Sequence, residues 1–167
     1  NEVKFDSSFA NLVFIMSSCN DTVSILDSYN NTQSIEILSG RGDDKINIGT
    51  AGRAFDDNLP APVVIDAGSG FDTVNIYDDG STVLKDQQVT ATLVRGLHDL
   101  KNNTVAYAGV EYLNLDLGST SMNVSSTATG SALTITCQLS SNVTILNTRG
   151  PLLLNMSDQD DHIKIFG

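Results

Sequence analysis

A short pattern of glycine and aspartate, followed at once by alternating apolar residues, constrains this chain more than any other feature because it occurs twice. The first copy covers residues 38–48 and the second, displaced by 28 residues, covers residues 67–76. Glycine allows the backbone to take positive φ, and residues that alternate along a strand point to opposite faces. The pattern therefore predicts two turns of the same shape, each leading into a strand whose apolar side chains enter the core.

Each copy also gathers carboxylates and exposed backbone carbonyls in a tight turn. Ca²⁺ takes about six to eight such oxygens at about 2.3–2.6 Å, and neighbouring strands lie about 4.8 Å apart, so a cation between two stacked turns can reach ligands from both. We therefore predict a calcium site, the alternative being ordinary glycine turns with solvated aspartates. The candidate residues are Gly40, Gly42, Asp43, Asp44, Asp66, Gly68, Gly70 and Asp72.

The two copies resemble the nonapeptide G-G-x-G-x-D-x-U-x of calcium-binding RTX repeats. Gly40, Gly42 and Asp44 match its second glycine, third glycine and aspartate, and the second copy matches at the same offsets. Ser39 and Ala67 stand where the repeat has its first glycine. The resemblance implies a parallel β-roll or β-helix of a large extracellular surface protein, with calcium bound in stacked turns.

Short apolar strands and polar turns continue to the end of the sequence, and helical periodicity is absent. The expected inward positions Val124, Val143 and Ile163 are 19 and 20 residues apart, which suits two short strands and two turns per repeat. We predict an all-β fold, a single parallel solenoid over residues 1–167 with about six coils. When the repeats are aligned in this way, Val124 occupies the position in the fourth coil that Val74 occupies in the third, and Met122 stands at the acid position of the fourth turn.

Two segments interrupt the regular repeat of short strands and turns. Residues 49–62 contain two prolines and several turn residues, which predicts a surface loop. Residues 78–108 are predicted to be an excursion from the solenoid with two short strands, at 89–94 and 105–107.

The charge of the chain limits its partners. Nine basic residues against 20 acidic ones give a net charge of −11, which argues against nucleic acid or an anionic membrane as a partner. No run of 18 apolar residues is present, so membrane insertion is not expected. Because residues 163–167 read as the start of another repeat, the predicted partners are flanking repeats of the same chain or like subunits in a filament.

Six sequons for N-linked glycosylation, more than the composition would produce by chance, indicate a secreted glycoprotein. Asn123 and Asn142 each precede a valine that should point inward, Val124 and Val143, so both asparagines are predicted to face solvent. The six asparagines are Asn20, Asn30, Asn102, Asn123, Asn142 and Asn155.

The two cysteines, Cys19 and Cys137, are predicted not to bond to each other. The proposed coil order places them about four strand spacings, or about 19 Å, apart, whereas a disulfide needs Cα atoms within about 7 Å. A buried thiol and a bond to a neighbouring subunit both remain open.

These features together predict an extracellular structural or adhesive module of a large surface or filament-forming glycoprotein, stiffened by calcium. The alternative is a carbohydrate-active or carbohydrate-binding β-helix. Catalysis is not expected, because the two histidines, His98 and His162, stand 64 residues apart without a recognisable constellation around them.

Overall fold

The computed structural model describes residues 10–28, 32–55, 61–98 and 103–166, whose secondary structure consists of β-strands almost without helix. Nine strands form one sheet in the order β1 (Asn11–Ile15), β3 (Ser34–Leu38), β5 (Val63–Asp66), β9 (Thr104–Ala108), β8 (Leu93–Arg95), β7 (Lys85–Val89), β11 (Thr120–Val124), β13 (Ser141–Ile145), β15 (His162–Ile165). Six strands form the other in the order β14 (Leu152–Asn155), β12 (Ala132–Cys137), β10 (Tyr112–Leu117), β6 (Thr73–Asp78), β4 (Lys45–Ile48), β2 (Thr22–Ile25).

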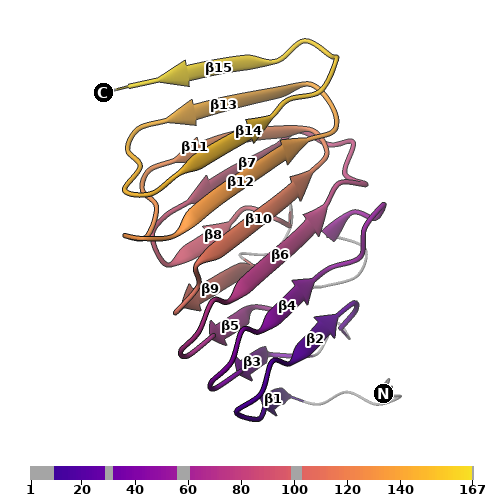
Figure 1. Ribbon diagram of the computed structural model, residues 1–167. Helices are drawn as coiled ribbons and strands as arrows, with labels where there is room; N and C mark the ends of the chain where they lie inside the picture. The colour runs from indigo at the N-terminus through magenta and orange to yellow at the C-terminus, as the bar shows by residue number, and fades with distance from the viewer. Residues whose placement is uncertain (1–9, 29–31, 56–60, 99–102, 167) are drawn as a thin grey trace.

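Except for β7, β8 and β9, which share the nine-stranded sheet, successive strands alternate between the two sheets, which lie one behind the other in Figure 1. The alternation of side chains along each strand directs every second residue into the space between the sheets. Ile35 and Ile37 of β3 and Ile46 and Ile48 of β4 are each 0 % exposed. The core is therefore a layer of branched aliphatic side chains, and the expectation of an all-β chain is confirmed.

The predicted parallel solenoid of about six coils is wrong. The six-stranded sheet is parallel throughout, but the nine-stranded sheet is mixed, because β8 runs antiparallel to both β7 and β9. Residues 78–108 are not an excursion, since β7, β8 and β9 lie in the middle of the nine-stranded sheet. The physical reason is that Val94 pairs with Val89 on one side and Val105 on the other, and all three valines are 0 % exposed.

The predicted alignment of the C-terminal repeats with the earlier ones is also wrong. Val74 pairs with Leu113 in the six-stranded sheet, whereas Val124 lies in the other sheet and pairs with Val89. Because β7, β8 and β9 all belong to the nine-stranded sheet, β10 returns to the six-stranded sheet and β11 to the nine-stranded one. The turns between β10 and β11 and between β12 and β13 therefore lead from the six-stranded sheet to the nine-stranded sheet, at the opposite ends of the strands from the glycine turns. Met122 lies within β11 and does not occupy the acid position.

Two of the expected segments differ in detail. The strand predicted at 89–94 is wrong, because β7 ends at Val89 and a tight turn precedes β8, with the N–H of Thr90 donating to the carbonyl of Leu93 at 2.9 Å. The strand predicted at 105–107 is confirmed within β9. In the segment 49–62, Phe55 is 1 % exposed and packs in the core, while residues 56–60 lie outside the described ranges.

Candidate functional site

The two glycine turns stack directly on each other, as their sequence alignment predicts. The first connects β3 to β4 and the second connects β5 to β6. Arg41 and Ser69 form a parallel bridge, in which the N–H of Gly42 donates to the carbonyl of Ser69 and the N–H of Ser69 donates to the carbonyl of Gly40, each at 3.0 Å. Gly40 therefore lies over Gly68, and Gly42 lies over Gly70.

The contact between these turns leaves no room for a side chain. A Cβ placed on Gly68 would lie 1.9 Å from the carbonyl oxygen of Gly40, and one on Gly70 would lie 1.9 Å from that of Gly42. All four glycines have positive φ, which other residues adopt only at a cost. The glycines are therefore required for the close approach of two backbone turns.

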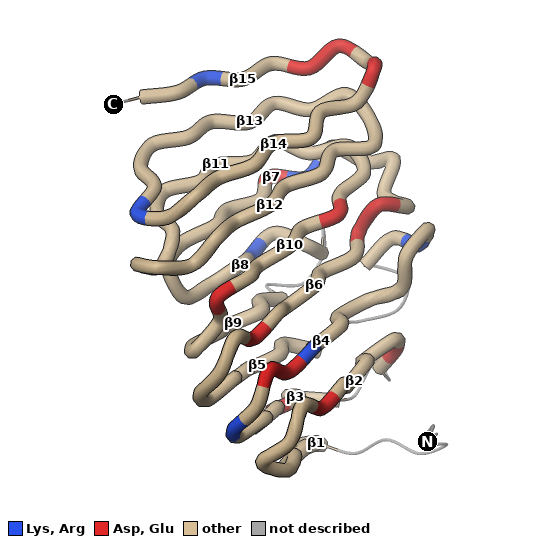
Figure 2. The backbone as a smooth tube through the Cα atoms, viewed as in Figure 1, with Lys and Arg blue, Asp and Glu red and all other residues tan. Residues whose placement is uncertain are grey.

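A column of acids runs along the start of the six-stranded sheet, beside these turns. The N–H of Asp21 donates to Asp44 Oδ1, the N–H of Asp44 to Asp72 Oδ1, and the N–H of Asp72 to Glu111 Oε2, each at 2.8 Å. Figure 2 shows acidic segments at the starts of β2, β4, β6 and β10, one on each of four neighbouring strands. We call these four residues the acidic column.

The two central acids of the column are buried and incompletely satisfied. Asp44 is 1 % exposed and Asp72 is 0 % exposed. In each, Oδ1 accepts a backbone N–H, but the buried Oδ2 has no hydrogen-bond partner in the described structure. A buried polar atom without a partner costs about 1–3 kcal/mol, and more when it is charged. The column therefore contains two carboxylate oxygens that are available to a further ligand.

The negative charges within the acidic column repel one another. Burial raises the pKa of Asp72, the hydrogen bond from the N–H of Asp44 opposes this, and the negative charges of Asp44, Glu111 and Asp43 raise it further. Two unit charges one strand spacing (about 4.8 Å) apart repel by about 3.5 kcal/mol at an effective dielectric constant near 20. A positive charge bound at Asp44 and Asp72 would relieve that repulsion.

Asp43 and Asp66, predicted as additional ligands, do not join the column. Asp43 is exposed, and its Oδ1 accepts the N–H of Phe71 at 3.0 Å. Asp66 is exposed at the end of β5, and its Oδ1 accepts the N–H of Gly68 at 3.2 Å. Both side chains therefore support the turns from outside, and the structure brings together only Asp44 and Asp72 of the predicted acids.

Asp21 and Glu111 belong to the column but are absent from the predicted ligand set. A common offset identifies them, since an acid stands two residues before the first inward apolar residue of each strand. The pairs are Asp21 and Val23, Asp44 and Ile46, Asp72 and Val74, and Glu111 and Leu113. The glycine pattern does not identify Glu111, because no glycine pair precedes it at the spacing seen before Asp44 and Asp72.

The donor set fits a hard cation only in part. Two free carboxylate oxygens beside closely stacked backbone carbonyls are the oxygen chemistry that Ca²⁺ prefers. Within the described ranges, however, no group of three or more His, Cys, Asp or Glu side chains is arranged to hold a metal ion. A cation at Asp44 and Asp72 would therefore depend on backbone oxygens and water for its remaining ligands.

Comparison with known proteins gives no relative. No family model, curated protein or solved structure matches the chain. Among the described residues, no helix is long and apolar enough to cross a membrane.

A second buried polar cluster lies where β6 leads into β7. Lys85 Nζ donates to Asp78 Oδ1 at 2.9 Å and Oδ2 at 3.0 Å, and also to the carbonyl of Leu97 at 2.8 Å. Asp78 additionally accepts the N–H of Phe55 at 2.7 Å and the Gln87 amide at 3.2 Å. Both charged side chains are 1 % exposed, so this ion pair connects the end of β6 to the start of β7 within the core.

Four of the six sequon asparagines lie in the described structure, and all four are exposed: Asn20, Asn123, Asn142 and Asn155. Asn30 and Asn102 lie outside the described residues. Val124 and Val143 are 0 % and 1 % exposed, which confirms the predicted outward orientation of Asn123 and Asn142.

The cysteines lie far apart, as predicted. Cys19 is an exposed free thiol in the turn before β2, and Cys137 is a buried free thiol at the end of β12. Four strand spacings separate β2 from β12, or about 19 Å, which exceeds the reach of a disulfide. Burial raises the pKa of the Cys137 thiol, although a hydrogen bond with Ser141 opposes the shift.

Proposed function

We propose that this chain is an extracellular structural or adhesive module whose stacked glycine turns are stabilised by calcium at the acidic column. The observation that carries this proposal is the pair of buried, unpartnered oxygens, Asp44 Oδ2 and Asp72 Oδ2. Asp44 and Asp72 directly precede β4 and β6, which are neighbouring strands in register, so a single divalent cation could interact with both carboxylates.

Bound calcium would provide a positive charge and a partner for the two unpartnered carboxylate oxygens of the acidic column. Asp44 and Asp72 would hold the ion, which would neutralise their mutual repulsion and provide the missing partner for each oxygen. The closely packed turns of Gly40 and Gly68 would supply backbone carbonyls. Few charged ligands give weak calcium affinity, with dissociation constants of about 10⁻⁴–10⁻³ M, the range of extracellular modules.

The way the sheets end supports the proposed mechanical role. In the described structure, β1 and β2 at one end and β14 and β15 at the other pair on one side only. Ile15 on β1 is 78 % exposed and Ile165 on β15 is 73 % exposed. The edge strands β1 and β15 run in the same direction, and so do β2 and β14. Each sheet could therefore continue by parallel pairing with strands from the same chain or from a like subunit. Such pairing would lengthen a stiff rod.

Thermal unfolding with and without calcium tests the metal assignment. Ligand that binds only the folded state stabilises it by about 2.7 kcal/mol at 100 times its dissociation constant. We expect millimolar calcium to raise the melting temperature relative to chelator, and Asp72→Asn to remove most of that gain while retaining the acceptor for the N–H of Asp44. Asp86→Asn, at an exposed aspartate of β7, is the matched control and should retain the gain.

Unchanged melting curves in calcium and in chelator would show that the acidic column binds no calcium. An equal gain in the Asp72→Asn variant would place the ion elsewhere in the chain. Sedimentation velocity tests the rod assembly separately, since Ile165→Lys should reduce self-association if β15 pairs with another copy.

A further inference from the structure

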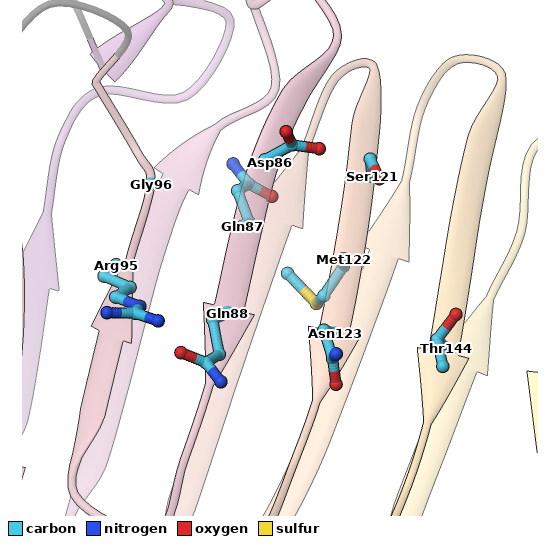
Figure 3. Close-up of a pocket in the computed structure, with 9 residues that line it drawn as sticks. All are labelled: Asp86, Gln87, Gln88, Arg95, Gly96, Ser121, Met122, Asn123 and Thr144. Carbon is cyan, nitrogen blue, oxygen red and sulfur yellow. The ribbon is translucent and has the colours of Figure 1, made fainter. Parts of the chain in front are cut away.

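A polar groove of about 550 Å³ lies on the outer face of the nine-stranded sheet. Its lining comes from β7, β8, β11 and β13, with the buried Gln87 and Met122 beneath the outward side chains. Figure 3 shows these side chains on neighbouring strands. The groove is on the opposite sheet from the start of β4 and β6, so it is separate from the acidic column.

The strand register arranges four of the lining side chains in one row. Arg95 pairs with Gln88, Gln88 with Asn123, and Asn123 with Thr144. Three strand spacings of about 4.8 Å make the row about 14 Å long. This spacing is close to the repeat of pyranose rings in an extended oligosaccharide, so successive sugar units could meet successive strands.

The polar groups in this row are not engaged by the protein. The side chains of Gln88, Arg95 and Asn123 make no hydrogen bond to any residue in the described part of the chain. Thr144, and Asp86 and Ser121 in the adjoining row, are equally unengaged there.

The outer face of the six-stranded sheet shows the contrasting arrangement. Asn75 donates to Asn47 at 2.8 Å and accepts from Asn114 at 2.9 Å, which forms a ladder across three strands. Gln88 and Asn123 are also register neighbours with side-chain amides, yet they make no such bond. Their donors and acceptors remain available to a ligand.

We propose that this groove binds a neutral, extended oligosaccharide. Amide, hydroxyl, carboxylate and guanidinium groups together offer donors and acceptors that match the hydroxyls of a sugar. Asp86 and Arg95 are the two charged residues of the lining, and their charges cancel. A chain net charge of −11 further disfavours an acidic polysaccharide.

Asn123 also belongs to a sequon, so a covalent glycan at this residue would occupy the same groove. Protein produced in a bacterial host, which adds no such glycan, therefore provides the free site. In protein from a eukaryotic host that carries a glycan on Asn123, binding of free oligosaccharide should be lost. Binding that persists beside that glycan would contradict the proposed position.

Calorimetric titration with cellohexaose, β-1,4-mannohexaose and hexagalacturonate tests the proposal on the bacterial protein. We expect at least one neutral hexasaccharide to bind, more tightly than hexagalacturonate. Asn123→Ala should weaken that binding about tenfold, as expected for the loss of about 1.4 kcal/mol of hydrogen bonding. Asn147→Ala, at an exposed asparagine outside the groove, is the matched control and should leave binding unchanged.

Three results would contradict the proposal or a part of it. Absence of binding by all three hexasaccharides would overturn the proposal, as would wild-type affinity in the Asn123→Ala variant. Tighter binding of hexagalacturonate would overturn the assignment of a neutral ligand. None of these outcomes bears on calcium at the acidic column.

Discussion

Gly68 and Gly130 have nearly the same backbone conformation, with φ of +82° and +84°, in very different surroundings. A Cβ on Gly68 would lie 1.9 Å from the Gly40 carbonyl oxygen, whereas one on Gly130 would meet nothing within 4 Å. Gly130→Ala should therefore cost only the conformational penalty of about 1–2 kcal/mol. Gly68→Ala adds a backbone clash and should cost more than about 3 kcal/mol.

Urea unfolding of the two alanine variants measures this difference directly. Equal losses of unfolding free energy would mean that the two glycine turns are not packed as closely as the structure describes.

At the residue scale, the sequence predicts the site only in part. The repeated glycines identify Asp44 and Asp72, because both stand at the same distance from a glycine pair and from an inward apolar residue. Glu111 has only the second of these relations. Its place beside Asp72 depends on which strand follows β6 in the sheet, and that is a long-range property that spacing along the chain does not contain.

At the scale of elements, the Asp78–Lys85 pair connects β6 to β7. Removing one partner of a buried ion pair costs about 3–5 kcal/mol, because the other charge is left uncompensated. Asp78→Ala should therefore lower the free energy of unfolding by about that amount. Replacing both partners, with Asp78→Leu and Lys85→Met, should recover much of the loss.

Equilibrium denaturation provides the measurement for these variants, and Asp86→Ala, at an exposed carboxylate, is the control, with a change within about 0.5 kcal/mol. A loss for Asp78→Ala as small as the control's would show that the pair is solvated.

Tyr107 of β9 supports the turn between β7 and β8, since its hydroxyl donates to the carbonyl of Thr90. Burial raises the pKa of Tyr107 to about 12, from an ordinary value of 10.0. A raised pKa in the folded state favours the protonated folded form, so this contribution is complete below pH 10 and is lost as the pH rises to about 12. Its full size is about 2.7 kcal/mol.

Tyr107→Phe should therefore be less stable than the wild type at pH 9, by about 1 kcal/mol for the lost hydrogen bond. The deficit should disappear and then reverse between pH 10 and 12, because only the wild type loses stability from this group and its loss of about 2.7 kcal/mol exceeds the deficit of about 1 kcal/mol. Urea unfolding at several pH values measures the difference, and a deficit that stays constant with pH would contradict the burial of this hydroxyl.

Strands β7, β8 and β9 show why the strand predicted at residues 89–94 is wrong. Alternation of apolar and polar residues identifies strands but is the same for parallel and antiparallel neighbours. The run Val89–Val94 alternates like a strand, yet its two valines face each other across a turn. Pairing of Val94 with Val105 then closes the antiparallel unit, and this pairing has no local signal.

At the scale of the whole molecule, the alternation of strands between two sheets creates the acidic column. Every strand of the six-stranded sheet is parallel to its neighbours and in register, so residues at one offset before each strand form a line. An all-β chain with apolar strands and stacked glycine turns is predictable from the sequence. The mixed sheet is not, because no local feature of the sequence shows that β8 stays in the same sheet as β7 and β9 and runs antiparallel to both.

The most direct test of calcium at this column is a crystal structure determined in the presence of calcium, with anomalous diffraction to identify the ion. We predict an anomalous peak about 2.3–2.6 Å from both Asp44 Oδ2 and Asp72 Oδ2. Water or no density at this position, in crystals grown at millimolar calcium, would contradict a calcium-stabilised column.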